Sequence, residues 1–266
     1  MERSVVSQHI FAQWPRYVLL YGGMIAALLV IGVSVARGWF SFVLLGLVVF
    51  LVCAFFLVMN LWAVVKVYGR NGIRPHHALF DLGRIQTHHK IVYINLGSRQ
   101  QPIALSHRLT TGHITVVDVY NPQWITAKPL ARQPGNPADD PRLTWIDGDI
   151  HLLPFPDSSV DNVILCEILS QFWQHGDRLI LLKEIHRILQ PKGQLLIAEK
   201  RRTMNTWLVD GPAALQIPTQ AYWEELISEA GFRIRKELNR DGLITCWRVS
   251  RPTLREARQL AFDLDY

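Results

Sequence analysis

The chain has 266 residues, of which 49% are hydrophobic and 19% are charged, and its formal net charge is +6. This apolar content excludes an intrinsically disordered chain, and three cysteines cannot form a disulfide framework over such a length. An ordinary soluble domain has about 25% charged residues, so the distribution of charge along this chain is informative.

Two uncharged runs near the N-terminus account for the low charge content. Residues 17–36 form a run of 20 residues, and residues 38–65 form a run of 28 residues, without Asp, Glu, Lys or Arg. A membrane-spanning helix needs about 20 apolar residues, so the sequence predicts two transmembrane helices. The alternatives are buried helices of a soluble protein or a signal peptide, but a signal peptide has a shorter apolar core and a small-residue cleavage site, which is not evident.

Basic residues flank the two runs. They are Arg3 and Arg16 before the runs, Arg37 in the connecting turn, and Lys66, Arg70 and Arg74 after the runs. Because Lys and Arg favour the cytoplasmic side, we expect a multi-pass protein of the cell membrane. Its anchor would comprise residues 1–70, and the domain at residues 71–266 would be cytoplasmic.

From residue 75 onward, short apolar runs alternate with helical patterns. Strands are expected at 91–96, 114–118, 143–146, 160–165 and 194–198, helices at 75–90, 102–109, 123–132, 177–189, 219–230 and 252–262, and a hairpin at 232–238 and 243–249. This alternation predicts a parallel sheet covered on both faces. The fold class is therefore α/β, a Rossmann-like, doubly wound, mostly parallel sheet of seven strands whose last strand is antiparallel, preceded by two transmembrane helices.

Three of the expected strands end in residues that suit a ligand. Gly97 follows the first strand, Asp118 ends the second, and Asp147-Gly148-Asp149-Ile150 follows the third. In such sheets, ligands bind at the carboxyl ends of the strands, where a carboxylate can accept hydrogen bonds from a ribose and a glycine allows close approach to the backbone. Each residue alone is also typical of a turn or a helix cap.

Three segments resemble a known enzyme family. Residues 147–163, DGDIHLLPFPDSSVDNV, resemble the GD-x-x-x-LPF-x-D-x-S-F-D-x-V segment of class I S-adenosylmethionine-dependent methyltransferases, in the branch that contains the ubiquinone and menaquinone biosynthesis enzymes. Residues 182–193 resemble the E-x-x-R-V-L-K-P-G-G segment of the same family, and residues 225–232 resemble its late helix and sixth strand. The resemblance covers residues 75–250 and implies a methyltransferase whose cofactor is S-adenosylmethionine.

The resemblance also implies roles for individual residues. It assigns cofactor binding to Gly97, Ser98, Arg99, Asp118, Asp149, Ile150 and Cys166. Residues 97–99 would lie around the methionine part of the cofactor, and Asp118 would bind the ribose hydroxyls. Asp149 and Ile150 would lie against the adenine, and Cys166 would line the pocket near the sulfonium.

The first glycine motif departs from the family pattern. The family has D-L-G-x-G-x-G, whereas this chain has Asn95-Leu96-Gly97-Ser98-Arg99-Gln100-Gln101. Arg99 could occupy the place of the methionine moiety, or its guanidinium could pair with the cofactor carboxylate. The sequence leaves both possibilities open.

Methyl transfer from a sulfonium depends mainly on positioning and desolvation, and it needs a base only to deprotonate a hydroxyl or a carbon acid. The candidates for such a base are His151, Glu167 and His175. No metal is expected, because the pairs His76-His77 and His88-His89 lack the spacing of a known site.

Two functions remain open at this point. The first is a membrane-anchored methyltransferase acting on a small or lipid-soluble acceptor, which a tethered domain would meet at high effective concentration. The second is a methyltransferase fold that has lost catalysis and serves as a scaffold or interaction module at the membrane, as the substitutions at positions 99 and 101 would suggest. A nicotinamide-binding domain is disfavoured because no G-x-G-x-x-G follows the first strand.

The expected partners are the lipid bilayer and a lipid-soluble substrate. No nucleic acid is expected, since no nucleic-acid motif accompanies the basic stretches at residues 200–202 and 233–236. The acceptor, the base and the oligomeric state are not determined by the sequence.

Overall fold

The computed structural model describes residues 14–69, 71–97, 99–121 and 140–253. The chain divides into two compact units, of which one comprises Met1–Ile73 and Thr203–Gln216 and the other Arg74–Arg202 and Ile217–Tyr266. No sequence pattern indicated that residues 203–216 belong with the N-terminal residues. Ser98 and the helices expected at 123–132 and 252–262 lie outside the described residues.

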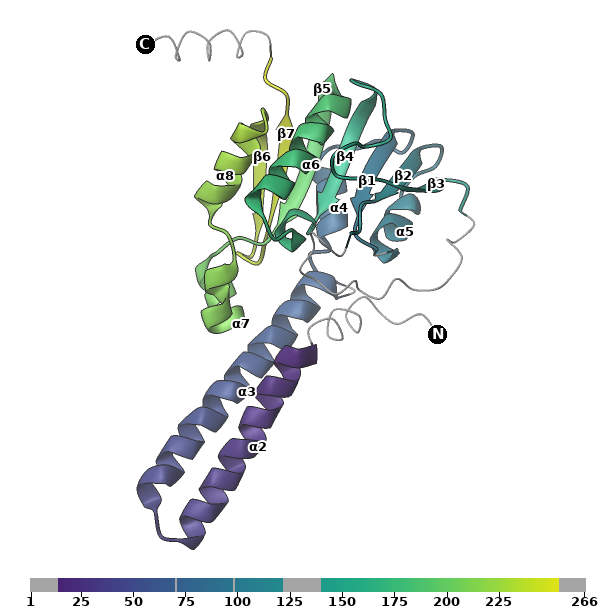
Figure 1. The fold of residues 1–266 in the computed structure, drawn as a ribbon. Coiled ribbons are helices and arrows are strands. Elements are labelled where there is room, and N and C mark those ends of the chain that lie inside the picture. The colour runs from purple at the N-terminus through teal and green to yellow at the C-terminus, as the bar shows by residue number, and fades with distance from the viewer. Residues whose placement is uncertain (1–13, 70, 98, 122–139, 254–266) are drawn as a thin grey trace, which may run out of the picture. The chain divides into compact units, whose positions relative to one another are not determined.

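The first unit is built on two long helices, α2 (Trp14–Ala36) and α3 (Phe40–Tyr68), joined by a short turn (Figure 1). The backbones approach closely at Gly46, where an added Cβ would lie 2.7 Å from Ile31 Cγ1 and 3.2 Å from Ala27 O. The most apolar windows of the helices have mean hydropathies of 2.4 and 3.2, and only 11% and 6% of these windows are buried. Both helices are therefore long and apolar enough to cross a membrane, and neither is enclosed as the core helix of a soluble protein would be.

The same unit includes a helix that the sequence did not predict. Helix α7 (Met204–Asp210) starts at a capping box, in which the Thr203 and Thr206 side chains each accept a hydrogen bond from the other residue's backbone N–H. It continues into the 3-10 helix η2 (Gly211–Gln216). Gly211 has φ +57° and ends α7, so the turn suits a residue without a Cβ.

The second unit contains a seven-stranded sheet in the order β3-β2-β1-β4-β5-β7-β6. The strands are β1 (Lys90–Asn95), β2 (His113–Asp118), β3 (Leu143–Asp147), β4 (Val160–Cys166), β5 (Leu189–Glu199), β6 (Arg233–Arg240) and β7 (Ile244–Ser250). Strands β1 to β5 pair in parallel, whereas β7 is antiparallel to both of its neighbours. The structure therefore confirms the predicted fold class.

Helices cover both faces of this sheet (Figure 1). The short helices α4 (Pro75–Leu82) and α5 (Gln100–Ser106) pack on one face. On the other face, α6 (His175–Ile188) and α8 (Gln220–Glu229) enclose the main hydrophobic core, which includes Leu181, Trp223 and Ile94. A short 3-10 helix, η1 (Leu169–Gln171), links β4 to α6.

Several helix ends differ from the sequence-based prediction, among them both ends of α5, which spans Gln100–Ser106 instead of 102–109. Helix α4 stops at Leu82 instead of residue 90, because the chain packs tightly against β5 there: a Cβ on Gly83 would lie 2.6 Å from Leu196 Cδ1. Helix α6 stops at Ile188, and Leu189 already pairs with Val160 as the first residue of β5. The Pro-Lys-Gly sequence that was expected to follow a helix therefore lies within a strand.

Candidate functional site

The first three strands end side by side. In the register of the sheet, Asn95 of β1 lies beside Asp118 of β2, which lies beside Asp147 of β3. Strand β1 lies between β2 and β4, so the strand order reverses there. In open α/β sheets, the crevice outside the carboxyl ends at such a reversal is where ligands bind.

The residues around the end of β1 leave room for a ligand. Gly97 has φ +89°, and a Cβ built on it would meet no atom within 4 Å. Asn95 is buried, and its Nδ2 has no hydrogen-bond partner among the described residues. Asp118 is half-buried, and its Oδ1 accepts a hydrogen bond from Tyr120 N at 3.1 Å. This edge therefore offers open backbone at Gly97, just after β1, together with the Asn95 amide donor and the Asp118 carboxylate on neighbouring strands.

The two side chains that replace family glycines are used within the fold. Arg99 precedes α5, and its guanidinium carbon lies 5.8 Å from the ring centroid of Trp145 in β3, which is a cation–π arrangement. Gln101, in α5, accepts a hydrogen bond through Oε1 from the hydroxyl of Tyr93, at 2.5 Å. Tyr93 is fully buried, and burial raises the pKa of its hydroxyl well above the usual value. Gln101 thus supplies a hydrogen-bond acceptor for a hydroxyl that is buried in the apolar interior.

The loop after β3 holds Asp149 at the surface and Ile150 in the core. Asp149 Oδ1 accepts a hydrogen bond from His151 N at 2.8 Å and lies 2.9 Å from His151 Nδ1. These contacts, the backbone N–H first, lower the pKa of Asp149. Ile150 is fully buried and packs in the main core. His151 therefore contacts Asp149, the residue that the resemblance places beside the adenine.

The ends of β4 and β5 bring three acidic or thiol groups together. Cys166 is buried, and burial raises the pKa of its thiol well above the usual value. Glu167 follows it with φ +57°, and its N–H donates to Ala198 O at 2.8 Å. Glu199, the last residue of β5, is fully buried and accepts a hydrogen bond from Leu169 N at 2.6 Å, which ties η1 to the sheet.

Sequence reasoning missed two polar residues at this edge, Asn95 and Glu199. Burial raises the pKa of Glu199 to about 7, and the nearby Glu167 acts in the same direction. The available signal for Glu199 was a lone acidic residue that ends the apolar run Leu195–Ala198, but such a residue is equally typical of an exposed strand end. His175, in contrast, lies in the first turn of α6 and contacts α8, with Nδ1 3.1 Å from Tyr222 Oη and Nε2 2.9 Å from Glu229 Oε2.

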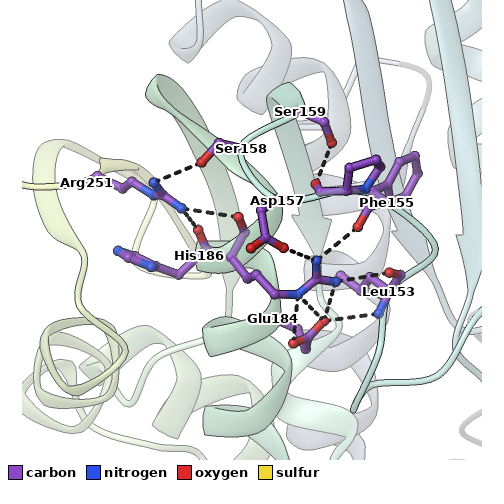
Figure 2. Close-up of polar contacts among 10 residues, drawn as sticks. Leu153, Phe155, Asp157, Ser158, Ser159, Glu184, His186 and Arg251 are labelled. Atoms are coloured by element: carbon purple, nitrogen blue, oxygen red, sulfur yellow. Dashed lines mark hydrogen bonds and ion pairs between the residues drawn. The ribbon is translucent and has the colours of Figure 1, made fainter.

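Figure 2 shows how α6 holds the loop that follows β3. Arg187 donates to Phe155 O at 3.0 Å, to Leu153 O at 3.1 Å and to Asp157 Oδ1 at 2.6 Å. Its Nη2 also donates to Glu184 Oε2 at 2.8 Å, and that carboxylate accepts Leu153 N at 3.2 Å. Two of the three segments that resemble the methyltransferase family therefore meet in space. Glu184 and Arg187 of the E-x-x-R segment hold the LPF-x-D loop through these hydrogen bonds, and we call this set of contacts the Arg187 bracket.

A second arginine reinforces the bracket (Figure 2). Arg251 follows β7 and donates to the backbone carbonyls of His186 and Arg187 and to Ser158 Oγ. Ser158 N in turn donates to Arg187 O at 2.9 Å. The loop is thus fixed from α6 and from the end of the sheet.

No metal site accompanies these groups within the described ranges. There, no cluster of three or more His, Cys, Asp or Glu side chains has the arrangement to hold a metal ion. The residues gathered at this edge are suited to hydrogen bonding with an organic ligand.

Comparisons with known proteins agree with this geometry. Residues 95–197 match the family model described as a methyltransferase domain. A search of the curated proteins found no match to the chain. Among solved structures, a SAM-dependent methyltransferase from Aquifex aeolicus is similar, with a TM-score of 0.51 and 15% identity over 66% of this chain and 88% of that one. The [4+2]-cyclase SpnF is similar with a TM-score of 0.52 and 17% identity, over 70% of this chain and 83% of that one.

Residues 95–197 of the second unit are thus similar to a methyltransferase domain, a class whose cofactor is S-adenosylmethionine, and the solved structures share the fold of this unit. The open backbone at Gly97, the unpaired Asn95 amide and the Asp118 carboxylate fit such a cofactor, which carries ribose hydroxyls and an amino acid group. The roles of single residues toward it remain predictions.

We expect Arg187→Ala to lower the free energy of unfolding by about 2–3 kcal/mol, because it removes charge-assisted hydrogen bonds to Asp157, Glu184 and the carbonyls of Phe155 and Leu153. Chemical denaturation of the detergent-solubilised chain measures this loss. Arg187→Lys should recover little of it, since an ammonium cannot reproduce the planar fork. Lys192→Ala, at an exposed position, is the control; an Arg187→Ala variant as stable as this control would contradict the bracket.

Glu199 makes stability depend on pH. Between about pH 4.5 and 7, the carboxyl is protonated in the folded chain and ionised in the unfolded chain, so wild-type stability falls as the pH rises through this window. Glu199→Gln keeps the oxygen that accepts Leu169 N but cannot ionise. Its stability relative to wild type should therefore increase from pH 5 to pH 8, by about 3 kcal/mol at most. A difference that is constant with pH would show that Glu199 is not buried in its neutral form.

Proposed function

We propose that the methyltransferase domain matched at residues 95–197 is an active enzyme, and that the chain is a membrane-anchored, SAM-dependent methyltransferase for a small or lipid-soluble acceptor. The observation that carries this proposal is the sheet edge at the β1–β4 reversal. There, Gly97 leaves open space beside Asn95 and Asp118, which are in register on neighbouring strands. Buried polar atoms normally have a hydrogen-bond partner, so the unpartnered Asn95 Nδ2 favours a ligand at this edge over a purely structural role.

In this proposal, the chain binds and orients and does little acid–base chemistry. The cofactor supplies an electrophilic methyl group on its sulfonium. Asp118 accepts hydrogen bonds from the ribose hydroxyls, and Asn95 Nδ2 donates to a polar group of the amino acid part. Asp149, which the Arg187 bracket supports through the following loop, lies at the adenine end. Positioning of this kind and exclusion of water are the main sources of catalysis in an in-line methyl transfer.

The membrane anchor is the second part of the proposal. Helices α2 and α3 expose most of their large apolar side chains, including Leu19 (73%), Phe40 (75%) and Leu44 (65%). Such a surface is stable in hydrocarbon and unfavourable in water. The basic residues on the outer flanks of the pair favour a cytoplasmic location for both ends and for the methyltransferase domain.

The anchor also suggests the acceptor class. A domain tethered to a bilayer meets lipid-soluble molecules at high effective concentration, whereas a water-soluble acceptor would gain nothing from the tether. We therefore favour a quinone precursor, a polyprenoid or a lipid head group as the acceptor.

A catalytically inactive scaffold is the alternative. It is supported by Arg99 and Gln101, which stand where the family has glycines. Arg99 contacts Trp145 and Gln101 contacts Tyr93, so both side chains contribute to the fold. The similarity to a protein described as a [4+2]-cyclase also illustrates that this fold serves more than methyl transfer.

Cofactor binding separates the two functions. The full chain in detergent should bind S-adenosylhomocysteine in a calorimetric titration, and Asp118→Ala should weaken binding at least about tenfold, because a charge-assisted hydrogen bond contributes about 1.5–3 kcal/mol. Asp161→Ala, exposed at the other end of β4, should bind like wild type. No binding at millimolar ligand would refute the enzyme, and unchanged binding by Asp118→Ala would refute the ribose assignment alone.

Membrane integration and orientation have a direct test. In a bacterial host, the full chain should stay in the membrane pellet after alkaline carbonate extraction, because its apolar helices span the bilayer. A C-terminal tag should be digested by protease in inverted vesicles and protected in intact cells. Release by carbonate would contradict the anchor, and a tag protected in inverted vesicles would contradict the cytoplasmic orientation.

A further inference from the structure

The segment Thr203–Gln216, which connects β5 to α8, belongs to the same compact unit as α2 and α3. Its helix α7 lies beside α3 (Figure 1). Asp210 is the only charged residue of this segment, and it forms an ion pair with Arg16 of α2. Arg16 Nη2 also donates to Val209 O at 2.9 Å. The segment is therefore attached to the helical pair and carries no uncompensated charge.

The outward face of the segment is apolar. Thr206 and Val209 of α7 are buried, as are Gly211 and Ala214 of η2. The exposed large apolar side chains are Met204 (76%), Trp207 (38%), Leu208 (41%) and Leu215 (58%). Pro212 and Ala213 are exposed as well, and Gln216, at the end of η2, is the one exposed polar residue of the segment. A surface helix of a soluble protein turns polar residues outward, so this arrangement is the reverse of what water favours.

The contacts of the segment show which part of α2 and α3 it lies against. Arg16 lies in the first turn of α2, just before the charge-free run, and the next residue, Tyr17, donates its hydroxyl to Asn60 of α3. Gly211 lies against Phe56 of α3, because a Cβ built on it would be 2.9 Å from the Phe56 ring. Phe56 and Asn60 are one helical turn apart, about 6 Å along the axis. The segment thus contacts the pair where its uncharged surface begins.

We propose that residues 203–216 form an interfacial membrane element, whose outward face binds the lipid bilayer at the boundary between head groups and hydrocarbon. This inference rests on the proposed membrane anchor and goes beyond it, because it adds a lipid contact far from the N-terminal helices in sequence. The occupant is a lipid surface because the apolar face of the segment continues the apolar surface of α2 and α3 within one unit.

Two physical features support this assignment. An indole such as that of Trp207 is favoured at the membrane interface, where its apolar ring and its N–H are both accommodated. The pairing of Asp210 with Arg16 removes the charge that would otherwise oppose burial of the segment near the hydrocarbon. Exposed apolar residues on a short amphipathic element then bind the bilayer in proportion to the area that they bury.

The test uses the full chain reconstituted in liposomes of phosphatidylcholine and phosphatidylglycerol that contain a radiolabelled phosphatidylcholine. A photoreactive benzoylphenylalanine replaces one residue at a time, at Leu208, at Leu44 or at Leu152. All three are exposed leucines: Leu208 is in the segment, Leu44 is on α3, and Leu152 is 68% exposed in the second unit. We expect lipid adducts at positions 208 and 44, and about tenfold fewer at position 152.

The control positions separate the possible failures. Lipid adducts at 44 without adducts at 208 would overturn the interfacial segment and leave the anchor intact. An absence of adducts at 44 as well would overturn the anchor and the segment together. Equal labelling at 208 and 152, or a crosslink from 208 to a second copy of the chain in place of lipid, would also overturn the proposal. Because each replaced leucine is exposed, the substitutions leave the core unchanged.

Discussion

Parallel pairing of β1 with both β2 and β4 is the constraint on which the candidate site depends. Because the strands run in the same direction, their carboxyl ends meet at one edge, and the register places Asn95 beside Asp118. A shift of one residue would turn each of these side chains to the opposite face. Ile91–Asn95 is buried on both faces, so the packing of its side chains against the helices holds this strand in place. The core thus positions the polar edge.

The altered glycine motif shows how a fold can absorb a departure from a family pattern. Arg99 stacks against Trp145, and Gln101 satisfies the hydroxyl of the buried Tyr93. Both contacts lie on the face of the sheet that α5 covers, where Tyr93 and Trp145 are in register through Val116. The substitutions are therefore compatible with a stable domain, and Gly97 alone keeps the backbone conformation that the turn requires.

Much of the fold could be predicted because it depends on local patterns. Uncharged length predicted α2 and α3, and alternating apolar runs predicted the strands within one or two residues, apart from the early start of β5. The sequence missed α7 because its seven residues show no clear periodicity, and a capping box at Thr203 and Thr206 is the one local signal that could have indicated its start. The site residues came from the family resemblance, and single side chains at strand ends would otherwise have been indistinguishable from turn residues.

The sequence by itself determined the division into an apolar N-terminal pair and an α/β domain, since both follow from hydrophobic periodicity over neighbouring residues. Only the tertiary structure decided which distant residues meet. Arg187 and the loop at 153–157 are about thirty positions apart, and Arg16 and Asp210 are separated by 194. The burial that changes the ionisation of Glu199 likewise depends on elements from several parts of the chain. Hydrogen bonds and desolvation act over a few ångströms in space, whatever the separation along the sequence, so no local pattern encodes them.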